Sequence, residues 1–281
     1  MRHMKTISVN LKDVYPFLQG GKLDGMMTDY PYDGEVDKNW ARPAVLVIPG
    51  GGYAMASRRE GEPIASAFMG QGFQVFVLWY LTATEGVRYP EELLEASAAI
   101  DYIKKNAKEL NVNPDEVFVV GFSAGGHLTG NVAIEYKNVS QKAGVALDCK
   151  PAAVGLCYPV ISNTHGHFGS YINLLEGYSE EEKAELLKTL NLNEAVSEDT
   201  PPAFIWATAD DGVVPADNAI RFAQAMADHG RDFELHVYPH GRHGLATGNL
   251  DINPEGAELK KVRRWVEDCA EFFRQYCVEK F

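Results

Sequence analysis

Apolar residues along the chain gather in short runs that alternate with segments of helical periodicity. Six such runs stand at residues 42–50 (RPAVLVIPG), 73–81 (FQVFVLWYL), 116–120 (EVFVV), 152–160 (AAVGLCYPV), 203–209 (AFIWATA) and 233–239 (FELHVYP). The first two are too continuous for half-exposed strands, because a strand with one solvated face alternates apolar and polar residues. We therefore predict six strands, several of them buried on both faces.

The segments between these runs show the spacing of amphipathic helices. Ile64, Ala67 and Phe68 lie on one face of a predicted helix that ends at a glycine pair, and residues 90–110 predict one long helix. Two further helices are predicted at residues 216–230 and 257–277. Strands that alternate with helices predict an α/β protein, with a mostly parallel sheet covered by helices on both faces. We expect one such domain over residues 1–281.

Residues 161–201 interrupt this alternation, because they separate two strands by more than a crossover requires. The sequence SEEE at Ser179 predicts a capping box that opens a short acidic helix on the surface. An insertion here lies above the strand ends. The stretch before the helix, with His165, His167 and Phe168, is the better candidate for contact with a substrate.

Composition narrows the classes of partner. The formal net charge of −13 argues against nucleic acid and anionic membranes, which bind basic surfaces. No stretch has the length of a membrane span, and the N-terminus lacks the apolar core of a signal peptide, so we expect a cytoplasmic protein. A leader that had already been removed would leave no trace.

The four cysteines show no C-x-x-C spacing, and we interpret them as reduced structural residues. The sequence does not indicate an oligomeric state.

One serine stands inside a cluster of small residues, VVGFSAGGHL, at residues 119–128. Ser123 lies between Gly121 and Gly125, in the G-x-S-x-G pattern of a nucleophile elbow. Such an elbow is a sharp turn from strand to helix, and its neighbours must be small where the two elements nearly touch. The motif alone is a weak signal, because a Gly-Ser turn without chemistry has the same composition. His127, one helical turn later, is interpreted as a structural histidine.

The ends of two later strands carry the residues that would activate a serine. Asp210 and Asp211 follow the strand at 203–209, and His240 and His243 follow the strand at 233–239. Serine, acid and histidine in this chain order are typical of an α/β-hydrolase. The imidazole removes the serine proton, and the carboxylate orients the imidazole. Position alone leaves the choice open within each pair of residues.

A glycine triplet supplies a place for the oxyanion. IPGGGY follows the first core strand, and glycines let backbone N–H groups turn inward where side chains would block them. We expect the donors to be Gly51, Gly52 and the N–H of Ala124. The sequences HGRH at residues 240–243 and HGH at residues 165–167 suggest a metal site as an alternative. No cysteine or carboxylate completes a ligand set at a recognisable spacing. We therefore predict neither a metal nor a cofactor.

Five segments together resemble a known family: PGGGY, GFSAGGHL, YPV, TPPAFIWATADDGVVP and GRHGL. They are similar to those of the small α/β-hydrolase esterases known as acetyl esterases or xylanase-B-like esterases. The resemblance implies the α/β-hydrolase fold, with Ser123 as nucleophile, Asp211 as the acid and His243 as the base. It also implies acetyl groups on xylose-based or similar sugars as the substrate.

The expected reaction is hydrolysis of a small-molecule ester through an acyl-enzyme. Feruloyl esters and aryl formamides are alternative substrates on the same fold, and a peptidase of the acylaminoacyl type would need a large additional domain. A non-catalytic binding protein would normally have lost one member of the triad. The aromatic residues Tyr53, Trp79 and Tyr158 are candidates, with those of the insertion, to line an acyl or sugar pocket. For each of them, burial in the core is the competing explanation.

Overall fold

The computed structural model describes residues 4–28, 41–165, 167–250, 252–254 and 257–278. Its centre is an eight-stranded sheet in the order β1-β2-β4-β3-β5-β6-β7-β8. The strands are β1 (Met4–Asn10), β2 (Lys22–Thr28), β3 (Arg42–Ile48), β4 (Gln74–Trp79), β5 (Val112–Phe122), β6 (Val154–Cys157), β7 (Ala203–Thr208) and β8 (Phe233–Tyr238). The ladder is parallel from β4 through β8, and β1–β2 and β2–β4 are antiparallel. This is the α/β-hydrolase fold expected from the sequence.

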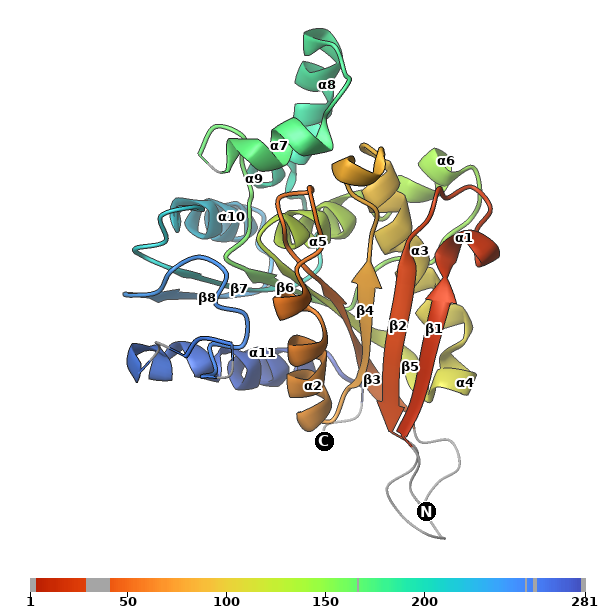
Figure 1. The fold of residues 1–281 in the computed structure, drawn as a ribbon, viewed down its shortest axis with the longest axis horizontal. Helices are drawn as coiled ribbons and strands as arrows, with labels where there is room; N and C mark the ends of the chain where they lie inside the picture. Colours follow the sequence, from red (N-terminus) through yellow and green to blue (C-terminus); the bar gives the residue numbers. More distant parts are fainter. Residues whose placement is uncertain (1–3, 29–40, 166, 251, 255–256, 279–281) are drawn as a thin grey trace, which may run out of the picture.

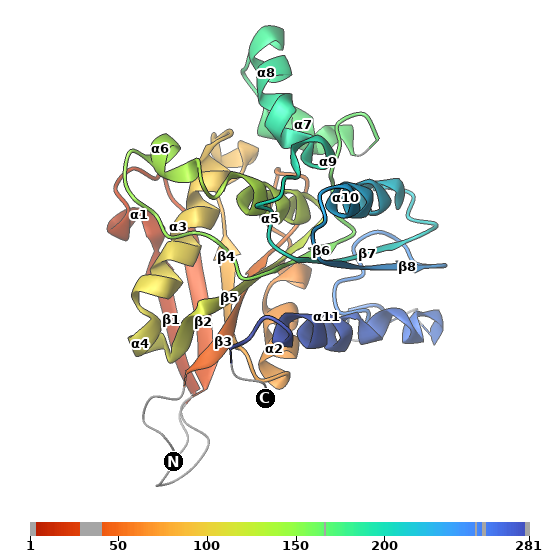
Figure 2. The same ribbon diagram turned by 180° about the vertical axis from the view of Figure 1, so that it is seen from behind.

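Helices cover both faces of the sheet (Figures 1 and 2). One face carries α2 (Glu62–Gly70) and α11 (Trp265–Arg274), and the other carries α3 (Glu91–Lys105), α5 (Ala124–Glu135) and α10 (Asp217–Asp228). Each face has its own apolar core, because strands with two covered faces point alternate side chains into opposite layers. The shorter helices are α1 (Leu11–Val14), α4 (Ala107–Leu110), α6 (Val139–Ala143), and the 3-10 turns η1 (Arg58–Glu60), η2 (Ala83–Glu85), η3 (Ala257–Lys260) and η4 (Val262–Arg264).

The six predicted strands all form, but three features of the fold differ from prediction. The sequence pattern missed the edge pair β1 and β2, because the side chains of β1 are exposed or only half-buried and give a weak apolar signal. The single helix predicted at 90–110 is broken at Asn106, whose side-chain amide donates to the carbonyl of Tyr102 and competes with the helical bonds. The last predicted helix begins as two 3-10 turns before α11.

The insertion folds into three helices above the carboxyl ends of the strands, where Figure 1 shows it at the top of the molecule. They are α7 (Phe168–Leu174), α8 (Glu180–Leu190) and α9 (Leu192–Ala195). The predicted capping box forms at Ser179, whose hydroxyl accepts from the N–H of Glu182 while the Glu182 carboxylate accepts from the N–H of Ser179. None of the helices in the described residues has the length and apolar character needed to cross a membrane.

Candidate active site

Ser123 occupies a strained turn between β5 and α5. Its backbone has φ 53° and ψ −117°, a conformation that a non-glycine residue rarely adopts. A Cβ at Gly121 would lie 2.1 Å from the carbonyl oxygen of Gly125, and one at Gly125 would lie 2.3 Å from that of Ile48. The two glycines of the motif are therefore required by close backbone contact between strand and helix.

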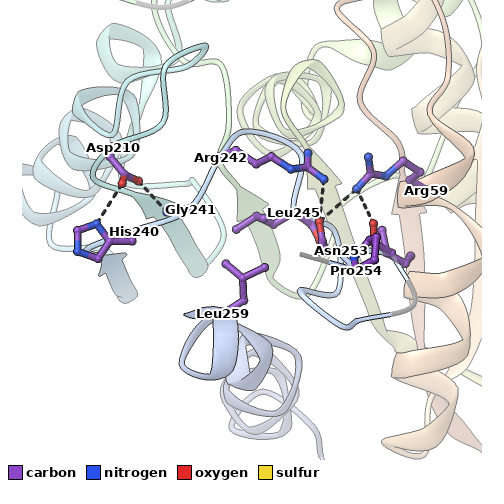
Figure 3. Close-up of a pocket in the computed structure, with 10 residues that line it drawn as sticks. Arg59, Asp210, His240, Gly241, Arg242, Leu245, Asn253, Pro254 and Leu259 are labelled. Carbon is purple, nitrogen blue, oxygen red and sulfur yellow. Dashed lines mark hydrogen bonds and ion pairs between the residues drawn. The ribbon is translucent and has the colours of Figure 1, made fainter. Parts of the chain in front are cut away.

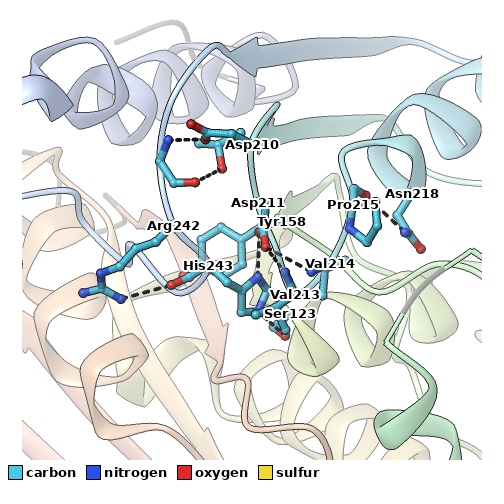
Figure 4. A network of polar contacts seen from close by, with 12 residues as sticks. Ser123, Tyr158, Asp210, Asp211, Val213, Val214, Pro215, Asn218, Arg242 and His243 are labelled. Carbon is cyan, nitrogen blue, oxygen red and sulfur yellow. Dashed lines mark hydrogen bonds and ion pairs between the residues drawn. The ribbon is translucent and has the colours of Figure 1, made fainter.

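The loops after β5, β7 and β8 bring Ser123, Asp211 and His243 together (Figure 4). His243 Nε2 lies 2.8 Å from Ser123 Oγ, and His243 Nδ1 lies 2.7 Å from Asp211 Oδ2. Because a carboxylate only accepts, Nδ1–H donates to Asp211, and Nε2 is left to accept from the serine hydroxyl. The ring is thus held in the tautomer that can remove the serine proton.

The Asp211 carboxylate is itself positioned by hydrogen bonds. Its side chain is fully buried, and its second oxygen accepts from the N–H groups of Val213 and Val214 at 2.8 and 3.0 Å. Figure 4 shows these bonds converging on the carboxylate beside the imidazole. Three hydrogen bonds therefore fix the carboxylate against His243.

Asp210 points the other way and binds the loop that carries the histidine. Its carboxylate accepts from the N–H of Gly241 at 2.7 Å and from His240 Nδ1 at 3.0 Å. These bonds, with Gly241 first, hold the pKa of Asp210 below its usual value. Neighbouring residues at a strand end point to opposite sides, so the Asp210–His240 pair lies in solvent while the Asp211–His243 pair faces Ser123.

The glycine triplet lies beside the serine. Gly51 and Gly52 line the same cavity as Ser123, a space of about 410 Å³, and their φ angles are +131° and +65°. A Cβ at Gly51 would lie 2.0 Å from the carbonyl oxygen of Met55. Ala124 is the first residue of α5, where the helix itself supplies no acceptor for the N–H. The three expected oxyanion donors are thus close to Ser123 in the fold.

Two residues that the sequence did not single out support this part of the site. Asn173, from α7, donates from Nδ2 to the carbonyl of Gly52 at 2.8 Å. Glu60 is buried, and its two oxygens accept from the N–H of Gly50 at 2.9 Å and the hydroxyl of Tyr158 at 2.7 Å. Burial raises the pKa of Glu60, and the two hydrogen bonds oppose that rise. Neither residue belongs to a motif, so no local signal marks it.

Of the six predicted substrate contacts, only His167 lines the cavity with Ser123. Tyr53 and Tyr158 are 1% and 2% exposed and lie in the core. The Tyr53 hydroxyl bonds His127 Nδ1, and the Tyr158 ring packs edge-on against His243 with centroids 5.0 Å apart. This corrects the prediction for both tyrosines. The hydroxyl groups of both tyrosines form hydrogen bonds within the protein. The ring of Tyr158 also packs against the imidazole of His243.

The other three candidates are also away from the cavity wall. Trp79 donates from Nε1 to Asp24 at 2.9 Å and packs against Gly61, so its indole belongs to the fold rather than to a pocket. Phe168 is 61% exposed on α7. His165 is half-buried, and its carbonyl accepts from Asn218. The structure therefore does not place Trp79, Phe168 and His165 as lining residues.

His127 is structural, as the sequence suggested. It is buried between Tyr53 and the carbonyl of Leu190, which lies 2.8 Å from Nε2. Burial lowers its pKa to about 4, although the bond to Leu190 opposes that change. A carbonyl only accepts, so Nε2–H donates and Nδ1 accepts from Tyr53. Across the described parts of the chain, no group of three or more histidine, cysteine, aspartate or glutamate side chains could hold a metal ion.

Comparison with known proteins identifies the family of the chain. Residues 32–226 match the family described as BD-FAE, and residues 186–277 match the dienelactone hydrolase family. The chain is 38% identical over 213 residues to endo-1,4-beta-xylanase B of Butyrivibrio fibrisolvens, and 34% identical over 212 residues to an acetylxylan esterase of Xylanibacter ruminicola. These matches cover 74% and 73% of this chain but only 33% and 41% of those proteins, so the chain spans well under half of either relative.

A solved structure matches over nearly its whole length. The acetyl ester-xyloside bifunctional hydrolase of Caldicellulosiruptor lactoaceticus is 32% identical, with a TM-score of 0.80 and 96% of each chain covered. The motif segments that resemble acetyl esterases, the fold and these matches lead to the same assignment. The chain therefore belongs to the BD-FAE family of α/β-hydrolases.

Proposed function

We propose that the chain is a serine esterase that hydrolyses short-acyl esters, with acetylated sugars of the xylo-oligosaccharide kind as substrates. One observation carries the proposal: His243 lies within hydrogen-bond distance of both Ser123 Oγ and the buried Asp211 carboxylate. The names of the relatives, an acetylxylan esterase and an acetyl ester-xyloside hydrolase among them, support the substrate class.

In the proposed first step, Ser123 Oγ attacks the ester carbonyl carbon while its proton passes to His243 Nε2. The carbonyl oxygen takes the negative charge and is stabilised by the N–H groups of Gly51, Gly52 and Ala124. Asp211 stabilises the imidazolium through Nδ1–H. His243 then gives the proton to the leaving alcohol oxygen, and the C–O bond breaks to leave an acetyl-serine.

In the second step, water attacks the acetyl-serine carbonyl as His243 takes one of its protons. The tetrahedral intermediate collapses, His243 returns the proton to Ser123 Oγ, and acetic acid leaves and ionises to acetate in solution. In both reaction steps, side chains of the protein carry out the proton transfers. The proposed substrate is a small molecule. The buried carboxylate of Asp211 is the group on which the charged histidine depends in both steps.

A direct assay tests this proposal. We expect acetate release from p-nitrophenyl acetate and from acetylated xylo-oligosaccharides, and loss of both activities in Ser123→Ala. Release from p-nitrophenyl acetate alone would support the chemistry but contradict the sugar class. Absence of both activities in the wild-type protein would contradict the proposal.

Aromatic esters are a second candidate, supported by apolar residues at the cavity. Met55 and Val213 line it and are 56% and 48% exposed. Exposed apolar side chains at a binding site offer a surface for an aromatic ring. Methyl ferulate and an aryl formamide in the same assay separate this candidate, because the acetyl esterase proposal expects lower kcat/KM for both than for p-nitrophenyl acetate.

A further inference from the structure

Two arginines lie where the cavity of Ser123 meets a larger one. Arg59 and Arg242 line both the cavity that contains Ser123 and His243 and a neighbouring cavity of about 860 Å³. Figure 3 shows the two guanidinium groups facing each other across Asn253. The larger space is of the size that small-molecule sites usually have, and the proposed mechanism gives it no role.

Both guanidinium groups are held in place by the protein. Arg242 donates from Nη2 to Asn253 Oδ1 at 2.9 Å and from Nη1 to the carbonyl of His243 at 3.1 Å. Arg59 donates from Nη2 to the same Asn253 oxygen at 3.3 Å and to the carbonyl of Ile252 at 3.1 Å. Asn253 is 4% exposed, and its amide donates to Leu245. This bond fixes the oxygen that the two arginines share.

The acceptors that the structure describes for these two positive charges are neutral amide and carbonyl oxygens. Within the described residues, neither arginine forms an ion pair with a carboxylate. Glu60 acts on Arg59 through space, but its oxygens accept from Gly50 and Tyr158. Asp210, in the larger cavity, accepts from His240 and Gly241. Two neighbouring like charges repel each other, and a bound anion relieves that repulsion.

The position of the arginines indicates which part of a substrate they reach. Under the proposed function, on which this inference rests, His243 protonates the leaving oxygen, so the alcohol portion of the ester lies on the His243 side. Arg242 is bonded to the carbonyl of His243, and Arg59 lies 3.4 Å from that of Gly244. The two guanidinium groups therefore flank the leaving alcohol rather than the acyl group.

We propose that Arg59 and Arg242 form a subsite for a carboxylate on the alcohol portion of the substrate. The substrate class is an acetyl ester whose alcohol carries an acidic group, such as an acetylated oligosaccharide with a uronic acid residue. Arginine suits this role, because its planar group donates two parallel hydrogen bonds to a carboxylate. The subsite determines specificity and takes no part in the chemical steps.

A matched pair of esters tests the subsite. In 4-acetoxyphenylacetate and its methyl ester, the acetyl group and the phenol are the same, and only the carboxylate on the alcohol portion differs. The measurement is the ratio of kcat/KM for the anionic ester to that for the neutral ester. We expect a ratio above one in the wild-type protein, and a ratio about tenfold lower in the double variant Arg59→Gln/Arg242→Gln, as for a lost charge-assisted hydrogen bond. Arg58→Gln removes an exposed positive charge that lines neither cavity, and is the matched control.

The outcomes separate this subsite from the proposed function. An unchanged ratio in the double variant, or an equal fall in Arg58→Gln, overturns the subsite even though the neutral ester is hydrolysed. If the wild-type protein hydrolyses neither ester, the proposed function itself has failed. A second measurement needs no variant: phenylacetate should inhibit the wild-type enzyme more strongly than phenylacetamide, with the difference shrinking in high salt. Equal inhibition by the two compounds contradicts the subsite.

Discussion

The side chain of Asn173 donates to the carbonyl of Gly52 at 2.8 Å, across a sequence separation of 121 residues. The bond joins the insertion to the glycine triplet. It fixes the peptide plane after Gly52, and the plane before it is fixed by the Gly51 carbonyl, which accepts from the N–H groups of Ala54 and Met55. The N–H of Gly52, a proposed oxyanion donor, lies in the second of these planes, so Asn173 of α7 restrains the peptide unit that adjoins this donor.

Asn173→Ala should therefore lower kcat for p-nitrophenyl acetate by about tenfold, as expected for a less ordered oxyanion site. KM should change less, because the carbonyl oxygen gains its charge only in the transition state. Steady-state kinetics measure the split. Glu180→Ala, a change of an 86% exposed side chain in the same insertion, is the control and should keep both constants. A rise in KM with kcat unchanged would indicate that Asn173 binds substrate instead.

Ser123→Ala should reduce ester hydrolysis by about a thousandfold or more, because among the described residues no other hydroxyl is bonded to His243. The fold should remain, with a thermal midpoint within about 2 °C of the wild-type value, since the change removes one small group from a turn. Activity and circular dichroism are measured on the same preparation. Residual activity above about a tenth of wild type is incompatible with Ser123 as nucleophile.

Asp211→Asn should lower kcat by about a hundredfold or more, because an amide can hold the imidazole in the wrong tautomer. Asp210→Asn is the matched control and should lower kcat less than about tenfold, since its exposed carboxylate binds the loop at Gly241 and His240 rather than His243. The comparison is made at saturating substrate. An equal loss in the two variants would contradict the separate roles of the neighbouring aspartates.

The buried carboxyl group of Glu92 should make the stability of the fold depend on pH. The side chain is fully buried, neither oxygen has a hydrogen-bond partner in the described part of the chain, and burial raises its pKa from 4.5 to about 8. A carboxyl with a raised pKa stabilises the fold when protonated, and that stability is lost as the pH rises from about 4.5 towards 8. The glutamine of Glu92→Gln stays neutral at every pH. The substitution should therefore stabilise the fold by about 1–3 kcal/mol more at pH 8 than at pH 4.5.

Urea unfolding of both proteins from pH 4.5 to pH 9 measures this difference. Glu62→Gln is the control, because Glu62 is exposed on α2 and the same change of charge should add no pH dependence. The neighbouring Glu95, whose pKa burial raises to about 9, keeps part of the dependence in the variant. Parallel stability curves for wild type and Glu92→Gln would show that Glu92 is ionised in the fold.

The acyl preference should be for acetate. The apolar side of α8 is occupied by the protein itself, because Leu190 is buried and Leu186 and Leu187 pack against the core. A lipase lid needs such a face free to meet lipid. We expect faster hydrolysis of p-nitrophenyl acetate than of the octanoate ester, with no jump in rate when substrate forms micelles. A rate that rises steadily through eight carbons would refute this.

The sequence alone determined the features that depend on local sterics and periodicity. The six core strands, the capping box at Ser179 and the glycines around Ser123 follow from short-range rules, since each depends on residues a few positions apart. The order of serine, acid and histidine was also visible, because each follows a strand of one parallel sheet. The apolar pattern did not predict the edge strand β1, because a strand without buried side chains has few apolar residues in alternation.

Tertiary structure decided what depends on direction and on distant partners. Asp210 and Asp211 are adjacent and identical in type, and only the packing of the loop after β8 against the end of β7 determines which carboxylate meets His243. The aromatic residues Tyr53 and Tyr158 were equally suited to a pocket or to the core, and their hydroxyl partners lie 74 and 98 positions away. Asn173 and Glu60 gained their roles the same way. A side chain's function is set by what lies at its polar end, and contacts between residues far apart in the chain decide that.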